Sequence, residues 1–165
     1  MPQHRVSTVE RHLLSRAHHE LDRVLARVEG TAQVVGTLDT SVLSGLVSSL
    51  LNDLDTALLP HMEWEEHVCF PEADGLAATP WATRLLRLQH DEIRGHLERL
   101  RTANLDQVEL HHPRVTELRA HLYALHALVT SHLEQEEHAL LTLLVPQPSV
   151  ADEALGDPSS RPSIV

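Results

Sequence analysis

The sequence repeats itself, and this repeat limits the possible folds more than any other feature of the 165-residue chain. Residues 61–67 read His-Met-Glu-Trp-Glu-Glu-His and residues 132–138 read His-Leu-Glu-Gln-Glu-Glu-His, so five of seven positions are identical at an offset of 71. The segments around His18 and His90 match at an offset of 72, and one loop residue accounts for the difference. The chain therefore consists of two copies of one unit.

Each copy has the hydrophobic pattern of two amphipathic helices. Apolar residues recur at three- and four-residue steps, and no alternating strand pattern is present. We expect helices over residues 7–29, 40–70, 79–104 and 112–145. Four long helices with short links predict an all-α fold, an up-down-up-down four-helix bundle built from two repeated helical hairpins.

Local signals mark several helix ends. Ser7 and Glu10 form a capping box at the start of the first helix, and Gly30 is expected to end it. Thr79, followed by Pro80, has the residue types of an N-cap and a first helical position, which predicts the start of the third helix.

The second helix contains a proline, Pro60, so it either bends there or consists of two pieces. Pro71 and Gly75 are expected to stop it. Residues 146–165 are rich in Pro, Ser and Asp and show no periodicity. We therefore expect a bundle domain over residues 1–145 and a disordered tail over 146–165.

Charge and cysteine content exclude several classes of partner and site. The formal net charge of -11 argues against nucleic acid and anionic membrane surfaces as partners. A single cysteine, Cys69, excludes a disulfide framework and a thiolate zinc site. No stretch approaches the roughly 18 apolar residues that a membrane span needs. We expect a soluble, cytoplasmic protein of unknown oligomeric state.

Histidine is abundant, at 14 of 165 residues, and its placement points to a metal site. His61 and Glu65 are four residues apart and share a helix face, as do His132 and Glu136, while His18 and His90 each lie on an apolar stripe. A bundle would thus enclose four imidazoles and two carboxylates. The predicted metal ligands are His18, His61, Glu65, His90, His132 and Glu136.

The chemistry of this ligand set favours two cations. Two buried carboxylates without partners would be costly, and cations would offset the cost. Mixed imidazole and carboxylate ligands suit iron or manganese better than calcium. Zinc is a weaker candidate, because six ligands exceed the needs of one tetrahedral zinc.

Alternatives exist for some of these residues. The His-x-x-x-Glu pairs could be ion pairs on a solvated face. A constant offset of 71 would select His19 in place of His18, whereas the apolar stripe favours His18. Glu66 and Glu137 lie about 100° from the ligand face, where they would contact a ligand from outside or face solvent. Cys69 is expected to be a small buried residue.

The order His, His-x-x-x-Glu, His, His-x-x-x-Glu over residues 7–145 resembles the hemerythrin-like, or HHE, domain. The resemblance implies a non-heme di-iron centre bridged by Glu65 and Glu136, with the four histidines as terminal ligands. Oxygen-carrying hemerythrins have a further histidine where this chain has Arg94, and an aspartate where it has Glu137. The chain thus resembles a four-His, two-Glu branch with more open coordination positions.

These open positions make reaction with a small ligand the leading hypothesis. We expect a di-iron protein that binds or reacts with O2, H2O2 or NO, in sensing, scavenging or oxidation, and an oxidoreductase activity is one form of this. An iron- or redox-responsive regulatory or partner-binding module is the alternative. A di-iron oxygenase acting on an organic substrate is a weaker one.

Overall fold

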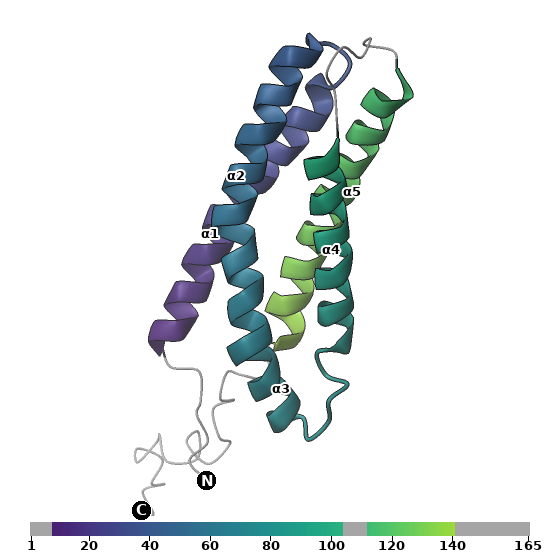
Figure 1. The fold of residues 1–165 in the computed structure, drawn as a ribbon. Coiled ribbons are helices and arrows are strands. Elements are labelled where there is room, and N and C mark those ends of the chain that lie inside the picture. The colour runs from purple at the N-terminus through teal and green to yellow at the C-terminus, as the bar shows by residue number, and fades with distance from the viewer. Residues whose placement is uncertain (1–7, 104–111, 141–165) are drawn as a thin grey trace, which may run out of the picture.

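The computed structural model describes residues 8–103 and 112–140, and its architecture is a four-helix bundle (Figure 1). Four long helices form it: α1 (Thr8–Val34), α2 (Thr40–Trp64), α4 (Arg84–Thr102) and α5 (Pro113–Gln135). Each long helix packs beside two others, in the order α1, α2, α4, α5 and back to α1. The described residues contain no strand, and the predicted fold class is confirmed.

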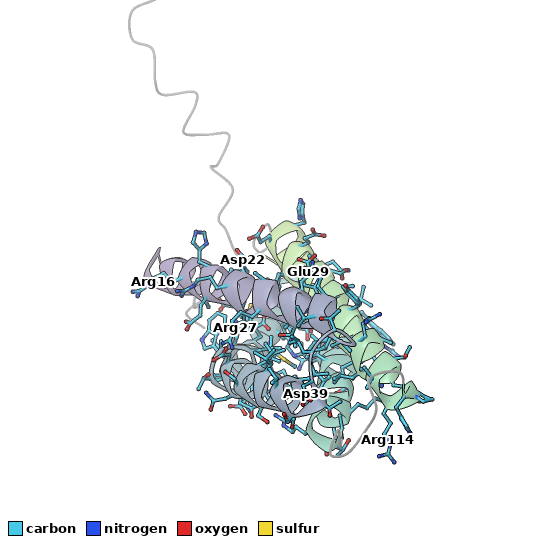
Figure 2. The ribbon with its side chains drawn as sticks, turned by 90° about the horizontal axis from the view of Figure 1, so that it is seen from above. Arg16, Asp22, Arg27, Glu29, Asp39 and Arg114 are labelled. Atoms are coloured by element: carbon cyan, nitrogen blue, oxygen red, sulfur yellow. The ribbon has the colours of Figure 1, made fainter. Side chains whose placement is uncertain are left out.

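One apolar core runs along the bundle between the four helices. It is built from the predicted stripes, with Val28, Leu43, Leu58, Leu97 and Leu122 all fully buried. Charged side chains such as Asp22, Arg27 and Glu29 lie on the periphery (Figure 2). This division of apolar and charged faces is what amphipathic helices need in order to pack.

The first helix does not end at Gly30, and this prediction is wrong. α1 continues to Val34 because its apolar stripe continues through Ala32, and Val35 closes the core just beyond it. The turn is instead made at Gly36, whose φ is +83°. The positive φ favours glycine, and a Cβ there would also lie 2.8 Å from a guanidinium nitrogen of Arg119, which would have to move.

The second helix begins at Thr40 as expected, with Asp39 accepting a hydrogen bond from the amide of Ser41. Pro60 lies inside α2 without ending it. The regular hydrogen-bond pattern changes later, at a π-helical turn over Glu65–Cys69 in which the amide of Phe70 donates to the carbonyl of Glu65. Such turns insert one extra residue into a helix and often occur at functional sites.

A short helix, α3 (Phe70–Leu76), follows the π turn, so Pro71 does not stop the second helix. Pro71 is tolerated because it lies in the first turn of α3, where a missing amide hydrogen costs nothing. The same π geometry recurs over Glu136–Leu140, directly after α5. The second copy of the repeat therefore reproduces the irregularity of the first.

The third predicted helix begins later than Thr79–Pro80, which lie in a turn. α4 starts at Arg84 with Thr83 as its N-cap. The amide and hydroxyl of Thr83 both donate to the carboxylate of Asp74, at 3.0–3.1 Å. This contact with α3 sets the start of α4. The predicted start of the fourth helix at His112–Pro113 is confirmed.

The segment Thr40–Leu76 is the one described helical stretch that is long and apolar enough to cross a membrane, with a mean hydropathy of 1.3 over its best window. The expectation that no stretch has this property is therefore wrong. A core helix of a soluble bundle passes the same test, and one such helix is weak evidence for a membrane span. Here the segment contributes Leu50 and Leu54 to the core, and it carries His61 and Glu65 into the interior.

Some predictions lie outside the described residues. These are the capping serine Ser7, the end of the fourth helix at residue 145 and the tail over 146–165. The third helix ends at Thr102, two residues before the predicted end at residue 104.

Candidate metal centre

The six predicted ligands converge inside the bundle as two groups of three. The first, which we call the His18 group, consists of His18, His61 and Glu136. The second, the His90 group, consists of Glu65, His90 and His132. Each group takes its two imidazoles from one hairpin and its carboxylate from the other, so neither hairpin could form a group alone.

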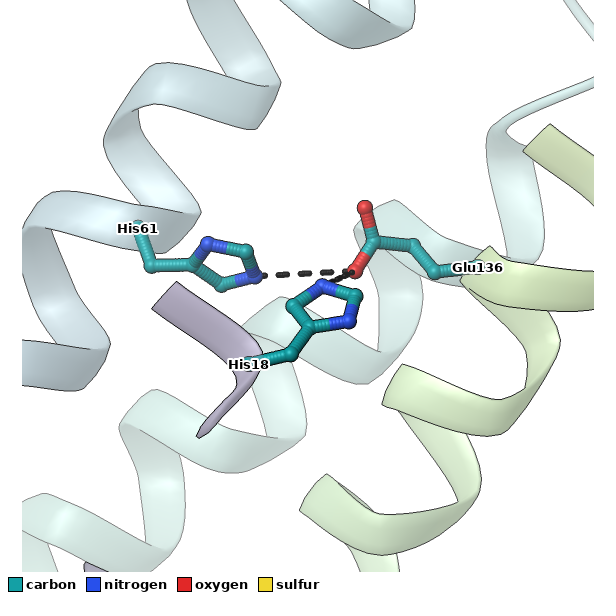
Figure 3. A group of neighbouring side chains, drawn as sticks. All are labelled: His18, His61 and Glu136. Carbon is teal, nitrogen blue, oxygen red and sulfur yellow. Dashed lines mark ion pairs between the residues drawn. The ribbon is translucent and has the colours of Figure 1, made fainter. Parts of the chain in front are cut away.

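In the His18 group, two imidazoles from α1 and α2 face one carboxylate at the end of α5 (Figure 3). Oε2 of Glu136 lies 3.2 Å from Nε2 of His18 and 3.5 Å from Nε2 of His61. Both histidines are 6% exposed and Glu136 is 1% exposed. Of the two adjacent histidines on α1, His18 thus faces the core and His19 faces solvent.

In the His90 group, Oε2 of Glu65 lies 3.1 Å from Nε2 of His90 and 3.4 Å from Nε2 of His132. The two Nε2 atoms are 3.1 Å apart. All three residues are 0% exposed, and the ring of Phe70 packs against His90 with the ring centroids 5.2 Å apart. This group is therefore fully enclosed.

Glu65 connects the two groups. Its second oxygen, Oε1, lies 3.6 Å from Nε2 of His61, while Oε2 faces the His90 group. One carboxylate thus presents an oxygen to each group, which is the arrangement that a bridging ligand requires.

The protonation states of the two imidazoles in the His90 group suit cation binding. Burial, together with the charge of His90, lowers the pKa of His132 to about 3, and burial also lowers the pKa of His90. These imidazoles are therefore neutral near pH 7 and have a lone pair to donate. Burial and the neighbouring Glu136 raise the pKa of Glu65, whereas interactions with Glu65, His18 and His61 outweigh burial and lower the pKa of Glu136.

Several ligand atoms are buried without a hydrogen bond. They are Nε2 of His18, Nε2 of His61, Oε1 of Glu65 and both carboxylate oxygens of Glu136. A buried polar atom without a partner costs roughly 1–3 kcal/mol, and a buried charge costs more. Cations between these atoms would satisfy all five. The residues therefore fit a pair of metal ions held by nitrogen and oxygen ligands.

Contacts from outside orient three of the four imidazoles. The Nδ1 atom of His90 lies 2.7 Å from a carboxylate oxygen of Glu66, whose other oxygen accepts a hydrogen bond from Arg94 at 2.9 Å. Nδ1 of His132 lies 3.2 Å from the side-chain oxygen of Gln89. Nδ1 of His18 lies 3.4 Å from Glu137. Such contacts fix the tautomer and leave Nε2 free to bind a metal.

Sequence reasoning expected Glu66 and Glu137 to touch a ligand from outside or to face solvent, and both contact an imidazole. It missed Gln89 altogether. A signal was available, because the steps from Leu86 to Gln89 and on to Ile93 place this polar residue on the apolar stripe of α4. Cys69 is buried as predicted, and burial together with the nearby carboxylates raises the pKa of its thiol.

Comparison with known proteins identifies one family. The profile of the hemerythrin HHE cation binding domain matches residues 9–144, which is most of the chain. No curated protein matches the sequence, and no solved structure matches it.

Proposed function

This chain belongs to the hemerythrin HHE cation-binding domain family, and on that basis we propose that it is a non-heme di-iron protein that binds or reacts with O2, H2O2 or NO. The observation that carries the proposal is the pair of adjoining, buried groups, each of two histidines and one glutamate, between which Glu65 is shared. Because the groups share a carboxylate, ions held in them would be adjacent and open to the same small ligand.

In this proposal the His18 group would hold one iron and the His90 group would hold the other. The carboxylates of Glu65 and Glu136 and the four imidazoles would be the protein ligands of the two ions. When bound, the two irons supply electrons and open coordination positions for a small ligand. Six protein ligands for two ions leave such positions, which is why this four-His, two-Glu set supports ligand reaction. Manganese and zinc are weaker candidates.

The surrounding residues would keep the site dry and its ligands oriented. Phe70 and Met62 are fully buried, and Phe70 covers one face of His90. Glu66 and Gln89 hold the Nδ1–H groups of His90 and His132. A rigid, water-poor enclosure strengthens electrostatic interactions with a bound ligand and protects reactive species from side reactions.

The first test is the metal content of aerobically purified protein, followed by stopped-flow mixing of the reduced protein with O2, H2O2 and NO in turn. We expect about two irons per chain and a change in the visible spectrum with at least one ligand. Two irons without any spectral change would contradict the reactivity. One zinc, or no metal even after anaerobic iron reconstitution, would contradict the di-iron site.

The five buried ligand atoms that make no hydrogen bond favour a second candidate, an iron- or redox-responsive regulatory or partner-binding module. Loss of metal would leave these atoms uncompensated, so metal loading could control folding or a surface. Melting curves with and without metal distinguish the two functions. A large metal-dependent shift in Tm without any ligand turnover would favour the regulatory role.

We also propose a cytoplasmic location, which agrees with a fold that uses no disulfide, since its one cysteine, Cys69, is free and buried. Fractionation of expressing cells would test it, and recovery with the membranes would contradict it.

A further inference from the structure

The two groups have ligands of the same types, so the repeat allows their surroundings to be compared position by position. The residues around the two groups differ. We infer that the two groups are inequivalent: the His90 group is preorganised and binds the first metal ion, whereas the His18 group binds the second ion more weakly and releases it first. This inference rests on the proposed two-metal site, and it concerns the residues outside the ligand set.

Both imidazoles of the His90 group are anchored from outside. The Nδ1–H of His90 donates to Glu66 at 2.7 Å, and Arg94 holds the other oxygen of that carboxylate at 2.9 Å. The Nδ1–H of His132 donates to Gln89, which is itself 9% exposed. Anchored rings lose little conformational freedom when a metal binds, and carboxylate partners also make an imidazole a stronger ligand.

The repeat replaces two of these anchors in the His18 group. At an offset of 72, Gln89 corresponds to Ala17 and Arg94 corresponds to Asp22. Alanine offers no acceptor, and among the described side chains none bonds to Nδ1 of His61. Asp22 is an exposed acid on the outer side of α1 (Figure 2), so it cannot support a second carboxylate.

The remaining anchor of the His18 group is weaker than its counterpart. Glu137 approaches Nδ1 of His18 only to 3.4 Å, and its side chain is 57% exposed, against 23% for Glu66. Among the described residues no arginine pairs with Glu137. An exposed, unsupported carboxylate moves freely and is screened by water, so it orients an imidazole poorly.

Burial differs in the same direction. His90 and His132 are 0% exposed, whereas His18 and His61 are each 6% exposed. Phe70 packs against His90 in addition to the ring of His132, whereas His18 has a ring contact only with His61 among the described residues. Water therefore has closer access to the His18 group, which favours exchange of an ion held there.

The test uses the full chain, freed of metal by chelation and titrated anaerobically with Co2+. Isothermal titration calorimetry would give the two affinities, and the visible absorption of Co2+ would report each coordination environment. Outer-shell changes alter metal affinity by about 10- to 100-fold, so we expect two steps that differ by at least about 10-fold.

Three variants test which group binds the metal ion in each of the two titration steps. Gln89→Leu keeps volume but removes the acceptor, so it should weaken the first step by about 10-fold and leave the second unchanged. Gln89→Glu restores an acceptor and should restore the first step. Ala17→Gln introduces the missing anchor for His61 and should strengthen the second step. The absorption of the first-bound Co2+ should shift in Gln89→Leu and not in Ala17→Gln.

Equal affinities in the wild type would overturn the inference and leave the two-metal site intact. A weakening of only the second step by Gln89→Leu would also overturn it, because the anchored group would then fill last. Binding of fewer than two ions would overturn both the inference and the proposed function. Circular dichroism of the metal-free variants checks that each is folded. If Gln89→Leu fails this check, the effect of Ala17→Gln on the second step decides alone.

Discussion

At the scale of single residues, the spacing of His61 from Glu65 and of His132 from Glu136 indicates a site of imidazole and carboxylate ligands. Each pair lies on one helix face because four residues make slightly more than one helical turn. What the pairs become depends on the opposite hairpin, since each group combines histidines of one hairpin with a carboxylate of the other. Glu65 is the residue on which both groups depend.

We therefore expect Glu65→Ala to abolish binding of both metal ions, because Glu65 presents one oxygen to each group. Metal analysis after reconstitution should fall from about two ions per chain to less than one. Glu63→Ala is the matched control, since Glu63 lies on the same turn of α2 and is exposed. Retention of two ions by Glu65→Ala would contradict the bridging role.

The lowered pKa of His132 predicts a pH dependence for the metal-free protein. Its pKa is about 3 in the folded chain against 6.5 when exposed. Between these values the unfolded chain binds a proton that the folded chain does not, so stability is full above about pH 7 and falls as the pH drops. At pH 5 this one group should cost about 2 kcal/mol.

Urea unfolding at pH 5 and pH 7.5 measures this effect. His90, whose pKa is also lowered, acts in the same direction, whereas the raised pKa values of His18 and Glu65 oppose it. His132→Leu should reduce the difference between the two pH values, and substitution of the exposed His19 by Leu should not. An unchanged difference in His132→Leu would show that His132 does not carry it.

At the scale of elements, two glycines of the first hairpin have different roles: one lies inside a helix and the other forms a turn. Gly30 lies inside α1 with open space around its Cβ position, while Gly36 has a φ of +83° and faces Arg119. The sequence predicts the helix end at Gly30, because glycine often ends helices. The apolar stripe continues beyond Gly30, and so does the helix.

Gly30→Ala should therefore stabilise the protein by roughly 0.5–1 kcal/mol, because alanine is the better helix former. Gly36→Ala should destabilise it by roughly 1–2 kcal/mol, because alanine is strained at positive φ and its Cβ would displace the Arg119 side chain. Thermal unfolding of the two variants measures both effects. Effects of the same sign would contradict the assignment of the turn to Gly36.

The start of α4 provides a second prediction at this scale. The carboxylate of Asp74 accepts hydrogen bonds from both the amide and the hydroxyl of Thr83, which is fully buried. Asp74→Ala would leave these groups unpaired and should lower the free energy of unfolding by roughly 1–3 kcal/mol. Exposed Asp91 offers a matched control, and an equal loss in Asp91→Ala would show that the effect is not specific to the cap.

At the scale of the whole molecule, we expect a bound metal centre and the bundle to stabilise each other. The two hairpins meet at the site, where the two histidines of each hairpin face a carboxylate of the other hairpin. Without metal, five buried polar atoms in this region make no hydrogen bond, so the cost would fall on the packing of one hairpin against the other.

Chelation should accordingly lower the Tm of the whole bundle, and restoring the ion should reverse the change. The shift grows with the metal concentration relative to its Kd, by about 2.7 kcal/mol at a hundredfold excess. Differential scanning calorimetry at several metal concentrations would measure it. A Tm independent of metal would contradict the coupling of the site to the fold.

The sequence by itself determined the fold class, the repeat and five of the six residues that meet in the core, and it favoured His18 over His19 as the sixth. It could do so because helical period, apolar stripes and four-residue spacing are local properties that every bundle with this connectivity keeps. It also predicted that both hairpins contribute ligands of the same type.

The tertiary structure decided what depends on contacts between distant segments. The start of α4 follows from Asp74 on α3, the end of α1 from core packing around Ala32, and the choice between His18 and His19 from the position of Glu136. The structure also shows the π turns at Glu65 and Glu136 and the contact of Gln89 with His132. These features depend on how the helices are placed relative to one another, which no local sequence pattern predicts. The two half-sites differ in sequence at Gln89 against Ala17 and at Arg94 against Asp22, but only the packing of the hairpins shows which imidazole each residue supports.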